Sequence, residues 1–275
     1  MVKRIFKLLS IALISISQNY IVFGQTPTRI VSLAPSLTKN VYFLEQQHKL
    51  VGCTSYCDTA VANGKEVVAS AVKVNIEKVV SLKPDLVITT TMTNPETLDM
   101  LKKFNIRVET FPTAKSFDEI CKQTIRLGQI IGAESNAKRI VTQSETKIKS
   151  LASSTRKDKS PSVFFQIGAK PLFTVIPGTF MNDYILLAGG KNVVTTTKTG
   201  TITREAVIAS NPDVIFIVTM GIVGNEEKNV WESYSTLNAA RNKKIFIIDS
   251  NDACTPTPVT FVKTLERVIN LIYSK

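Results

Sequence analysis

Residue types that carry out catalysis are scarce in this sequence and are not spaced for a reaction. The chain has one histidine, His48, in the polar stretch QQHKL, and four cysteines without a Cys-x-x-Cys pair. A zinc site of ordinary type needs three or four His, Cys or carboxylate ligands at short spacings. The sequence also lacks a Gly-x-Ser-x-Gly elbow, a phosphate loop and a dinucleotide fingerprint. We therefore expect ligand binding through aromatic, amide and backbone groups, with no metal site and no catalysis.

One pair of carboxylates recurs at matched positions of two related segments. Residues 77–88 read EKVVSLKPDLVI and residues 205–216 read EAVIASNPDVIF, so that Glu77 and Glu205 coincide. Each Glu comes two positions after a residue that can cap a helix, which places it in a first helical turn. The helix dipole alone explains a Glu at that position. The equivalence adds a second hypothesis, that each half presents one carboxylate to a partner with two basic sockets.

Aromatic side chains offer a different chemistry, stacking on a ligand. Ligands of parallel sheets sit beyond the carboxyl ends of strands, and Tyr56 follows an apolar, strand-like run. Tyr56 is therefore the aromatic residue best placed to contact a ligand, with simple packing as the alternative. Trp231 precedes Tyr234 and Leu237 at helical spacing, which favours a role in the core.

The elements that must position these residues alternate between strands and helices. Apolar, β-branched runs predict strands at residues 29–34, 50–56, 86–91, 107–111, 162–168, 214–219 and 244–249. Strands that alternate with helices indicate an α/β fold, with mostly parallel sheets covered on both faces. Asp85 and Asp213, each after a proline at a strand entrance, are expected to cap locally.

A long amphipathic segment separates two such groups of strands. Apolar residues keep helical spacing from about Glu134 to Ser153, after the helix-ending Gly132 and before a polar linker. We expect two Rossmann-like lobes, residues 25–132 and 160–275, bridged by one long rigid helix and a linker at residues 133–159. Because a continuous helix resists bending, little lobe movement is expected on ligand binding.

The composition is that of a globular protein with a basic surface. The chain has 275 residues, 44% hydrophobic and 20% charged, and a formal net charge of +12. This balance excludes wholesale disorder. The basic residues are scattered and are not interleaved with aromatic ones, so a solvated surface is favoured and no nucleic-acid partner is expected.

The first 24 residues read as a secretory leader. Lys3, Arg4 and Lys7 precede an apolar run from Leu8 to about Ile16, and a plausible cleavage point follows Gly24. The run is shorter than the roughly 20 residues that a membrane span needs. No cysteine lies near the cleavage point, so we expect export without a lipid anchor.

Export makes disulfides feasible, and the four cysteines allow three pairings if all are bridged. Cys121 lies on the apolar side of a helical pattern and Cys53 near a strand end, so both are expected to be buried. Cys57 and Cys254 fall in expected loops. They are the better candidates for a bridge, with two unpaired thiols as the alternative.

Five segments carry a family resemblance across almost the whole chain after the leader. They read RIVSLAPSLT, VGCTSYCD, NIEKVVSLKPDLVI, TREAVIASNPDVI and WESYSTLNAARNKKIFIID. The sequence resembles the periplasmic substrate-binding proteins of ABC importers for cobalamin, haem and ferric siderophores, and is most similar to the cobalamin-binding members. The resemblance implies a periplasmic monomer without a cofactor of its own. It also implies a corrinoid, haem or ferric-chelate ligand and, as a partner, an importer permease dimer at the inner membrane.

The resemblance also assigns roles to residues. Glu77 and Glu205 match the two family positions that dock onto permease arginines. Pro35 and Tyr56 match cleft residues. Gly168 and Asn251, in loops at the far ends of strands, complete the expected ligand-binding set.

The sequence departs from the cobalamin binders in their ligand contacts. Those proteins have a Trp six residues before each docking Glu, where this chain has Ala71 and Thr199. An acid and an Arg of their last cleft loop are also replaced, around Asn251 and Thr255. Cobalamin, a smaller corrinoid, haem and a ferric chelate therefore all stay open as ligands. The alternative from a different class of function is an exported enzyme that uses the same cleft.

Overall fold

The computed structural model describes residues 26–70, 73–155, 160–195, 199–219 and 224–274. The expected leader at residues 1–24 and the position of Ala71 lie outside the described residues. No helix among the described residues is long and apolar enough to cross a membrane.

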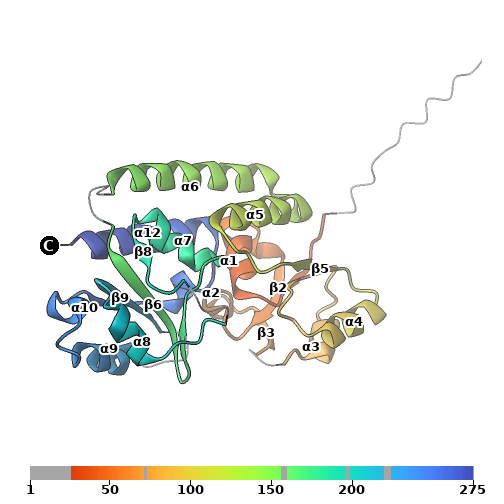
Figure 1. Ribbon diagram of the computed structural model, residues 1–275. Coiled ribbons are helices and arrows are strands. Elements are labelled where there is room, and N and C mark those ends of the chain that lie inside the picture. Colours follow the sequence, from red (N-terminus) through yellow and green to blue (C-terminus); the bar gives the residue numbers. More distant parts are fainter. Residues whose placement is uncertain (1–25, 71–72, 156–159, 196–198, 220–223, 275) are drawn as a thin grey trace, which may run out of the picture.

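The N-terminal half folds around a parallel five-stranded sheet in the order β3-β2-β1-β4-β5 (Figure 1). Its strands are β1 (Ile30–Ser32), β2 (Leu50–Thr54), β3 (Glu66–Ala69), β4 (Leu86–Thr90) and β5 (Val108–Phe111). The connections contain α1 (Pro35–Phe43), the 3-10 turn η1 (Gln47–Lys49), α2 (Asp58–Ala62), α3 (Ile76–Ser81) and α4 (Pro95–Lys103). Apolar residues are buried on both faces of the sheet, as expected for parallel strands.

The C-terminal half has a separate sheet in the order β10-β9-β6-β7, with β8 paired to β6. All its pairs are parallel except β6 with β7, which form an antiparallel hairpin. The strands are β6 (Ser162–Ala169), β7 (Leu172–Thr174), β8 (Lys191–Asn192), β9 (Val214–Val218) and β10 (Ile245–Ile248). The helices are α7 (Phe180–Leu187), α8 (Arg204–Ser210), α9 (Gly224–Glu232), α10 (Asn238–Arg241) and α11 (Ser250–Ala253). The protein thus has the expected two-lobe α/β fold.

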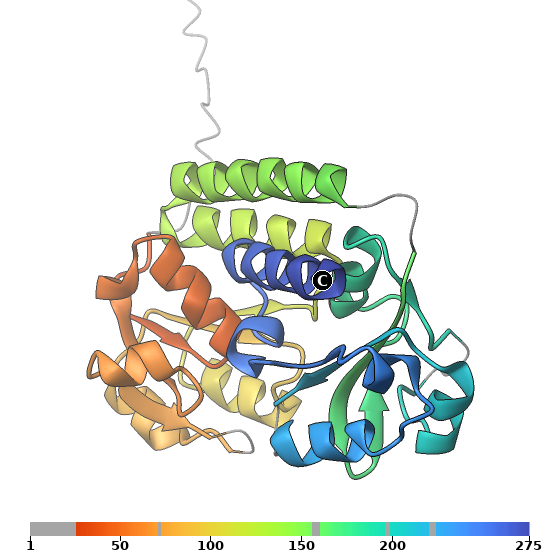
Figure 2. The same ribbon diagram turned by 90° about the vertical axis from the view of Figure 1, so that its left-hand side faces the viewer.

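Three helices lie together on one side of the molecule. They are α5 (Phe117–Ile131), α6 (Glu134–Ser154) and α12 (Pro258–Tyr273), and they pack against one another (Figures 1 and 2). The helix expected near Glu134–Ser153 is therefore α6. We call the three helices together the crosspiece.

The apolar residues of α5 and α6 are divided between the two cores. In α6, Ala137 belongs to the core of the N-terminal lobe and Ile148 to the core of the C-terminal lobe. In α5, Leu127 belongs to the N-terminal core and Ile120 to the C-terminal core. Bending between the lobes would expose these shared contacts, at a cost of about 25 cal/mol for each Å² of apolar surface.

Two aspartates at strand entrances fix the first strand of each lobe, a long-range role that corrects the expected local capping. The Asp85 carboxylate accepts hydrogen bonds from the backbone N–H groups of Thr28 (2.7 Å) and Arg29 (3.0 Å). Asp213 Oδ2 accepts from the backbone N–H of Ser162 (2.9 Å) and from its hydroxyl (2.8 Å). The internal repeat therefore includes the same clamp in both lobes.

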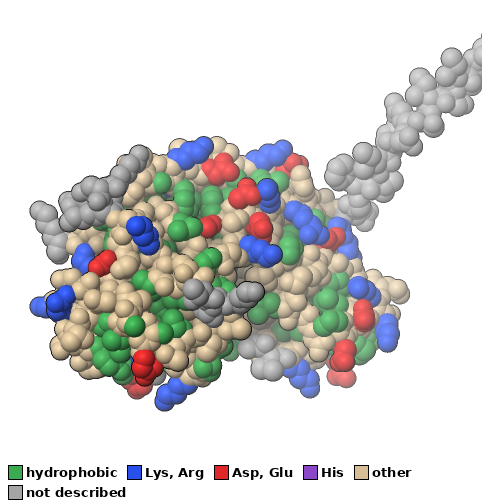
Figure 3. All heavy atoms as spheres, in the orientation of Figure 1, with side chains coloured by type: hydrophobic (Ala, Val, Ile, Leu, Met, Phe, Trp, Pro, Cys, Tyr) green, Lys and Arg blue, Asp and Glu red, His purple; other side chains and the backbone are tan. Residues whose placement is uncertain are grey.

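The surface mixes charges of both signs. On the face seen in Figure 3, Lys and Arg side chains are interspersed with Asp and Glu. This pattern agrees with a solvated basic surface.

The closest approach of α5 and α6 gives a test of the crosspiece. A Cβ added at Gly128 would lie 2.6 Å from the Ala137 Cβ and 3.1 Å from the Ala133 carbonyl oxygen. We expect Gly128→Ala to lower the free energy of unfolding by about 1–3 kcal/mol through overpacking, measured by urea denaturation. Ala137→Gly alone should cost about 1 kcal/mol of helix propensity. In the double variant Gly128→Ala with Ala137→Gly, removal of the Ala137 methyl group should relieve the clash, so the loss of stability should be smaller than the sum of the two single losses. A loss equal to that sum would contradict the close approach.

Candidate functional site

A hollow of about 480 Å³ lies at the carboxyl ends of the strands of the N-terminal lobe. Hydroxyl, amide and ammonium groups alternate in its wall with apolar side chains. Its lining is Leu33, Ala34, Pro35, Thr54, Tyr56, Ala69, Ser70, Lys73, Val74, Thr90, Met92, Thr93, Asn94 and Thr97. This is the position at which parallel α/β sheets bind ligands.

A second hollow, of about 460 Å³, is lined by residues of both lobes. The N-terminal lobe contributes Pro35, Thr38, Lys39, Tyr42, Phe43, Tyr56, Cys57, Asp58, Thr59 and Ala60, and the C-terminal half contributes Asn251, Asp252 and Thr260. Pro35 and Tyr56 line both hollows. We call the two hollows together the cleft.

Local sequence explains how Pro35 and Tyr56 come to face the cleft. Pro35 begins α1, because a proline tolerates the first helical position, where its missing N–H has no partner to lose. β2 ends at Thr54, two residues earlier than expected, so Tyr56 stands on the following turn and its side chain is 58% exposed.

Of the four expected ligand-binding residues, Pro35, Tyr56 and Asn251 line one hollow, but Gly168 lies elsewhere. Gly168 belongs to the β6–β7 hairpin, where a Cβ would come within 3.2 Å of the Phe173 side chain. Its carbonyl accepts a hydrogen bond from Gln166 Nε2 (3.2 Å). Gly168 therefore has a packing role in the hairpin.

Next to this hairpin, Trp231 is fully buried, which confirms the core role predicted from its spacing. Its ring N–H donates to Gln166 Oε1 at 2.6 Å. Gln166 Nε2 donates in turn to Glu227 Oε2 at 2.7 Å, and Arg204 pairs with Glu227 at 2.6 Å. This network of hydrogen bonds and one ion pair holds the side chains of Trp231, Gln166 and Glu227 in place and ties them to Arg204, the first residue of α8.

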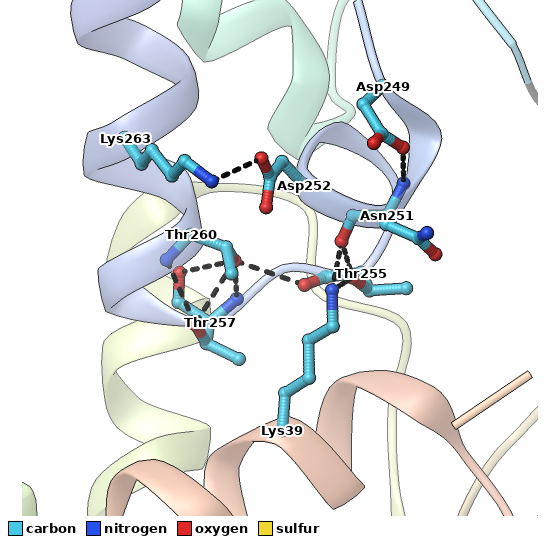
Figure 4. A network of polar contacts seen from close by, with 8 residues as sticks. All are labelled: Lys39, Asp249, Asn251, Asp252, Thr255, Thr257, Thr260 and Lys263. Carbon is cyan, nitrogen blue, oxygen red and sulfur yellow. Dashed lines mark hydrogen bonds and ion pairs between the residues drawn. The ribbon is translucent and has the colours of Figure 1, made fainter. Parts of the chain in front are cut away.

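A polar network joins the lobes beside the cleft (Figure 4). The Lys39 ammonium, on α1, donates to the Asn251 carbonyl and, at 2.7 Å, to Thr255 Oγ1. Asn251 Nδ2 donates to Asp58 Oδ2 across the lobes at 3.1 Å. Lys39 and Asp58 could not be recognised from the sequence, because their partners lie about two hundred residues away and no local pattern links them.

Burial lowers the pKa of Lys39, while Asp252, Asp249 and Asp58 act against that shift. The ammonium therefore gives up part of its hydration in exchange for two oxygen acceptors on the other lobe. Asn251 and Thr255 thus make hydrogen bonds between the lobes. In the cobalamin binders, the family resemblance places ligand contacts around these two positions.

Glu77 and Glu205 occupy equivalent places on the two lobes. Each stands in the first turn of a short helix, α3 or α8, and each is exposed. Asn75 and Thr203 cap these helices by accepting from Lys78 N (2.9 Å) and Ala206 N (3.2 Å). Figure 1 shows α3 and α8 on the side of the molecule away from α6.

Backbone and Thr203 hydrogen bonds lower the pKa of Glu205, so it is ionised at neutral pH. Glu77 also lines a surface groove with Ser70, Lys73 and Val74, which belong to the cleft wall as well. A docking surface at Glu77 would therefore adjoin the cleft.

The structure does not join Cys57 to Cys254, which corrects the expected bridge. All four cysteines are free thiols. Cys57 is buried in the core of the N-terminal lobe, and Cys254 packs against the core of the C-terminal lobe. Cys53 and Cys121 are buried, as expected. Across the described ranges, no group of three or more His, Cys, Asp or Glu side chains is placed to hold a metal ion.

Comparisons with known proteins agree with this geometry. The sequence model of the family described as "Periplasmic binding protein" matches residues 30–251. The ABC transporter substrate-binding lipoprotein YvrC of Bacillus subtilis is 31% identical over 94% of this chain and 83% of its own length. The vitamin B12-binding protein of Pectobacterium atrosepticum is 30% identical over 70% of this chain and 71% of its own.

A solved structure shares the whole architecture. It is that of a possible iron-binding (periplasmic solute-binding) protein from Staphylococcus epidermidis, with a TM-score of 0.80 and 26% identity. The match covers 91% of this chain and 100% of the other.

The Lys39 network gives a prediction for the contact between the lobes. Lys39→Met should lower the free energy of unfolding by about 1 kcal/mol, because a charge-assisted hydrogen bond across the lobes is lost from a half-buried site. Lys263→Met is the matched control, since Lys263 forms an ion pair with Asp252 and its side chain is 70% exposed. The control should change stability by less than about 0.5 kcal/mol. Equal losses, measured by urea denaturation with circular dichroism, would refute the interlobe role.

Proposed function

Because this chain belongs to the periplasmic binding protein family, we propose that it captures a corrinoid or an iron chelate between its lobes and delivers it to an ABC importer. Export by the leader at residues 1–24 places it outside the cytoplasm. It works as a monomer and carries no cofactor of its own.

The observation that carries the proposal is the cleft that both lobes line. Its two hollows meet at Pro35 and Tyr56, so one ligand can contact both. Exposed apolar side chains stand beside hydroxyls and amides there, with Met92 84% and Tyr56 58% exposed. Such a wall suits a large ligand with an apolar face and a polar edge.

The ligand class is supported by the relatives, one of which is named for vitamin B12 and one for iron. A haem- or siderophore-specific binder is the alternative to a corrinoid binder. It is favoured by Thr199, which stands where the cobalamin binders have a flanking Trp.

The proposal of a binding protein is favoured over an exported enzyme by the side chains in the cleft. The carboxylates of its lining are Asp58 and Asp252. Asp58 accepts from Asn251 and Asp252 pairs with Lys263, so both are used in structural contacts. Saturable binding without chemical change of the ligand would separate the two functions.

The test is a ligand panel on the purified mature chain. We expect one of cobalamin, cobinamide, haem or a ferric siderophore to bind with 1:1 stoichiometry in titration calorimetry. The same ligand should raise the melting temperature, because a ligand that binds only the native state stabilises it. If no member of the panel shifts the melting temperature at saturating concentration, the ligand class is wrong.

Tyr56 should contribute directly to affinity for the ligand found in that panel. We expect Tyr56→Ala to weaken binding by about 1–3 kcal/mol, because it removes an exposed aromatic ring from the point where the hollows meet. Tyr56→Phe keeps the ring and should bind nearly as the native chain does. Calorimetry that finds unchanged affinity in Tyr56→Ala would remove Tyr56 from the site.

Glu77 and Glu205 are proposed to dock onto basic residues of the permease dimer. Reversing both charges, Glu77→Arg with Glu205→Arg, should leave folding and ligand affinity nearly unchanged because both side chains are exposed. Association with the transporter and uptake should collapse, because like charges would then face one another. Each single reversal should give a partial loss in reconstituted vesicles.

The matched control reverses two other exposed first-turn glutamates, Glu96→Arg on α4 with Glu226→Arg on α9. It changes the net charge equally and should leave uptake near normal. The docking role is wrong if the control loses uptake as severely as the Glu77 and Glu205 pair, or if that pair also loses ligand binding.

A further inference from the structure

One of the two hollows of the cleft contains a cation that the protein itself leaves without a partner. Lys73 lines the hollow at the carboxyl ends of the N-terminal strands, together with hydroxyl-bearing side chains such as Thr90 and Thr97. Among the described residues, no hydrogen bond or ion pair uses the Lys73 ammonium. The described lining of this hollow contains no carboxylate, so no acid in its wall balances the charge.

Backbone contacts on either side hold Lys73 at the end of β3. Ala69 and Val74 form an isolated antiparallel bridge. The Ser70 N–H donates to the Lys73 carbonyl at 2.9 Å, and the Lys73 N–H donates to the Ser70 hydroxyl at 3.2 Å. These bonds fix the backbone of Lys73 beside the hollow, while the residue itself is exposed, so its ammonium is accessible to a ligand.

The other hollow also has a cation, but that cation is already engaged. The Lys39 ammonium donates to two oxygens of the C-terminal lobe, and Asp58 and Asp252 belong to the same lining. An anionic group of a ligand would meet two carboxylates there and would have to break a contact between the lobes. Beside Lys73 neither obstacle exists, because Glu77 shares a surface groove with Lys73 but does not line the hollow.

We propose that Lys73 selects, among the ligands open to this cleft, one that carries an anionic oxygen group, such as a haem carboxylate or the oxygens of a ferric tris-catecholate. The inference rests on the proposed capture of a corrinoid or an iron chelate, and it narrows that class. A lysine ammonium is a compact charge with several N–H donors, and its hydrogen bonds to anionic oxygens are stronger than those between neutral groups. The attraction increases as the ligand displaces water from the hollow. A corrinoid, whose ring edge carries neutral amides, gains less from this ammonium.

Titration calorimetry with ligands of different charge tests the proposal on the purified mature chain. The anionic probes are haem and ferric enterobactin, a tris-catecholate. The other probes are cyanocobalamin, which is neutral overall, and ferrioxamine B, a cation. We expect haem or ferric enterobactin to bind at least about tenfold more tightly than the other two probes, and whichever binds tells carboxylate from catecholate oxygens.

The outcomes separate this inference from the proposed function. Equal or tighter binding of cyanocobalamin or ferrioxamine B overturns selection by charge and leaves the proposed capture of a corrinoid or iron chelate standing. Binding of none of the probes contradicts the proposed function, and the inference falls with it.

Substitution of Lys73 assigns the effect to this ammonium. Lys73→Gln should weaken binding of the anionic ligand about five- to thirtyfold, because a charge-assisted contact is lost. Lys73→Arg keeps the charge and should keep most of the affinity. The melting temperatures of both unliganded variants should match that of the native chain, since Lys73 is exposed.

The matched control is Lys103→Gln, which removes the same charge from an exposed lysine of α4 that lines neither hollow. It should bind the anionic ligand as the native chain does. Equal losses in Lys103→Gln and Lys73→Gln, or an unchanged affinity in Lys73→Gln, would overturn the role of Lys73 even where an anionic ligand binds.

Discussion

The packing of the crosspiece against both cores is the constraint on which the rest of the structure depends. In each of α5 and α6, residues near one end belong to one lobe and residues near the other end belong to the second lobe. α12 packs against both of these helices. The lobes therefore cannot swing apart without exposing apolar surface that α5 and α6 bury against both cores. Such a frame fixes the width of the cleft before any ligand arrives, so affinity depends on side chains already in place.

Within this frame the two lobes use the same local devices. An aspartate after a proline clamps the first strand, and a short capped helix presents one exposed glutamate. The lobes differ where they face each other. The N-terminal lobe contributes Pro35 and Tyr56 to the cleft, while the last loop of the C-terminal lobe is engaged by Lys39 and Asp58. The features that the two lobes share suit a partner with two equivalent sockets. The features in which the lobes differ, where they face each other, suit a single ligand.

The sequence predicted the fold because its strands and helices depend on local pattern, and three of the residues expected to bind ligand, Pro35, Tyr56 and Asn251, line one hollow of the structure. Alternating apolar runs indicated the parallel strands, and the Glu-to-Asp repeat located α3 and α8. The strand β3 was missed because it has only four residues, begins with the exposed Glu66 and pairs with β2 alone. The interlobe contacts of Lys39 could not be predicted, since they depend on tertiary packing.

Small-angle X-ray scattering of the mature chain, with and without a saturating ligand, tests the central claim most directly. If the crosspiece fixes the cleft, the two scattering profiles should superimpose and the radius of gyration should stay the same within error, apart from the mass of the ligand. A marked compaction on binding would mean that the lobes close like a hinge, and it would contradict the account of a cleft held open by shared apolar packing.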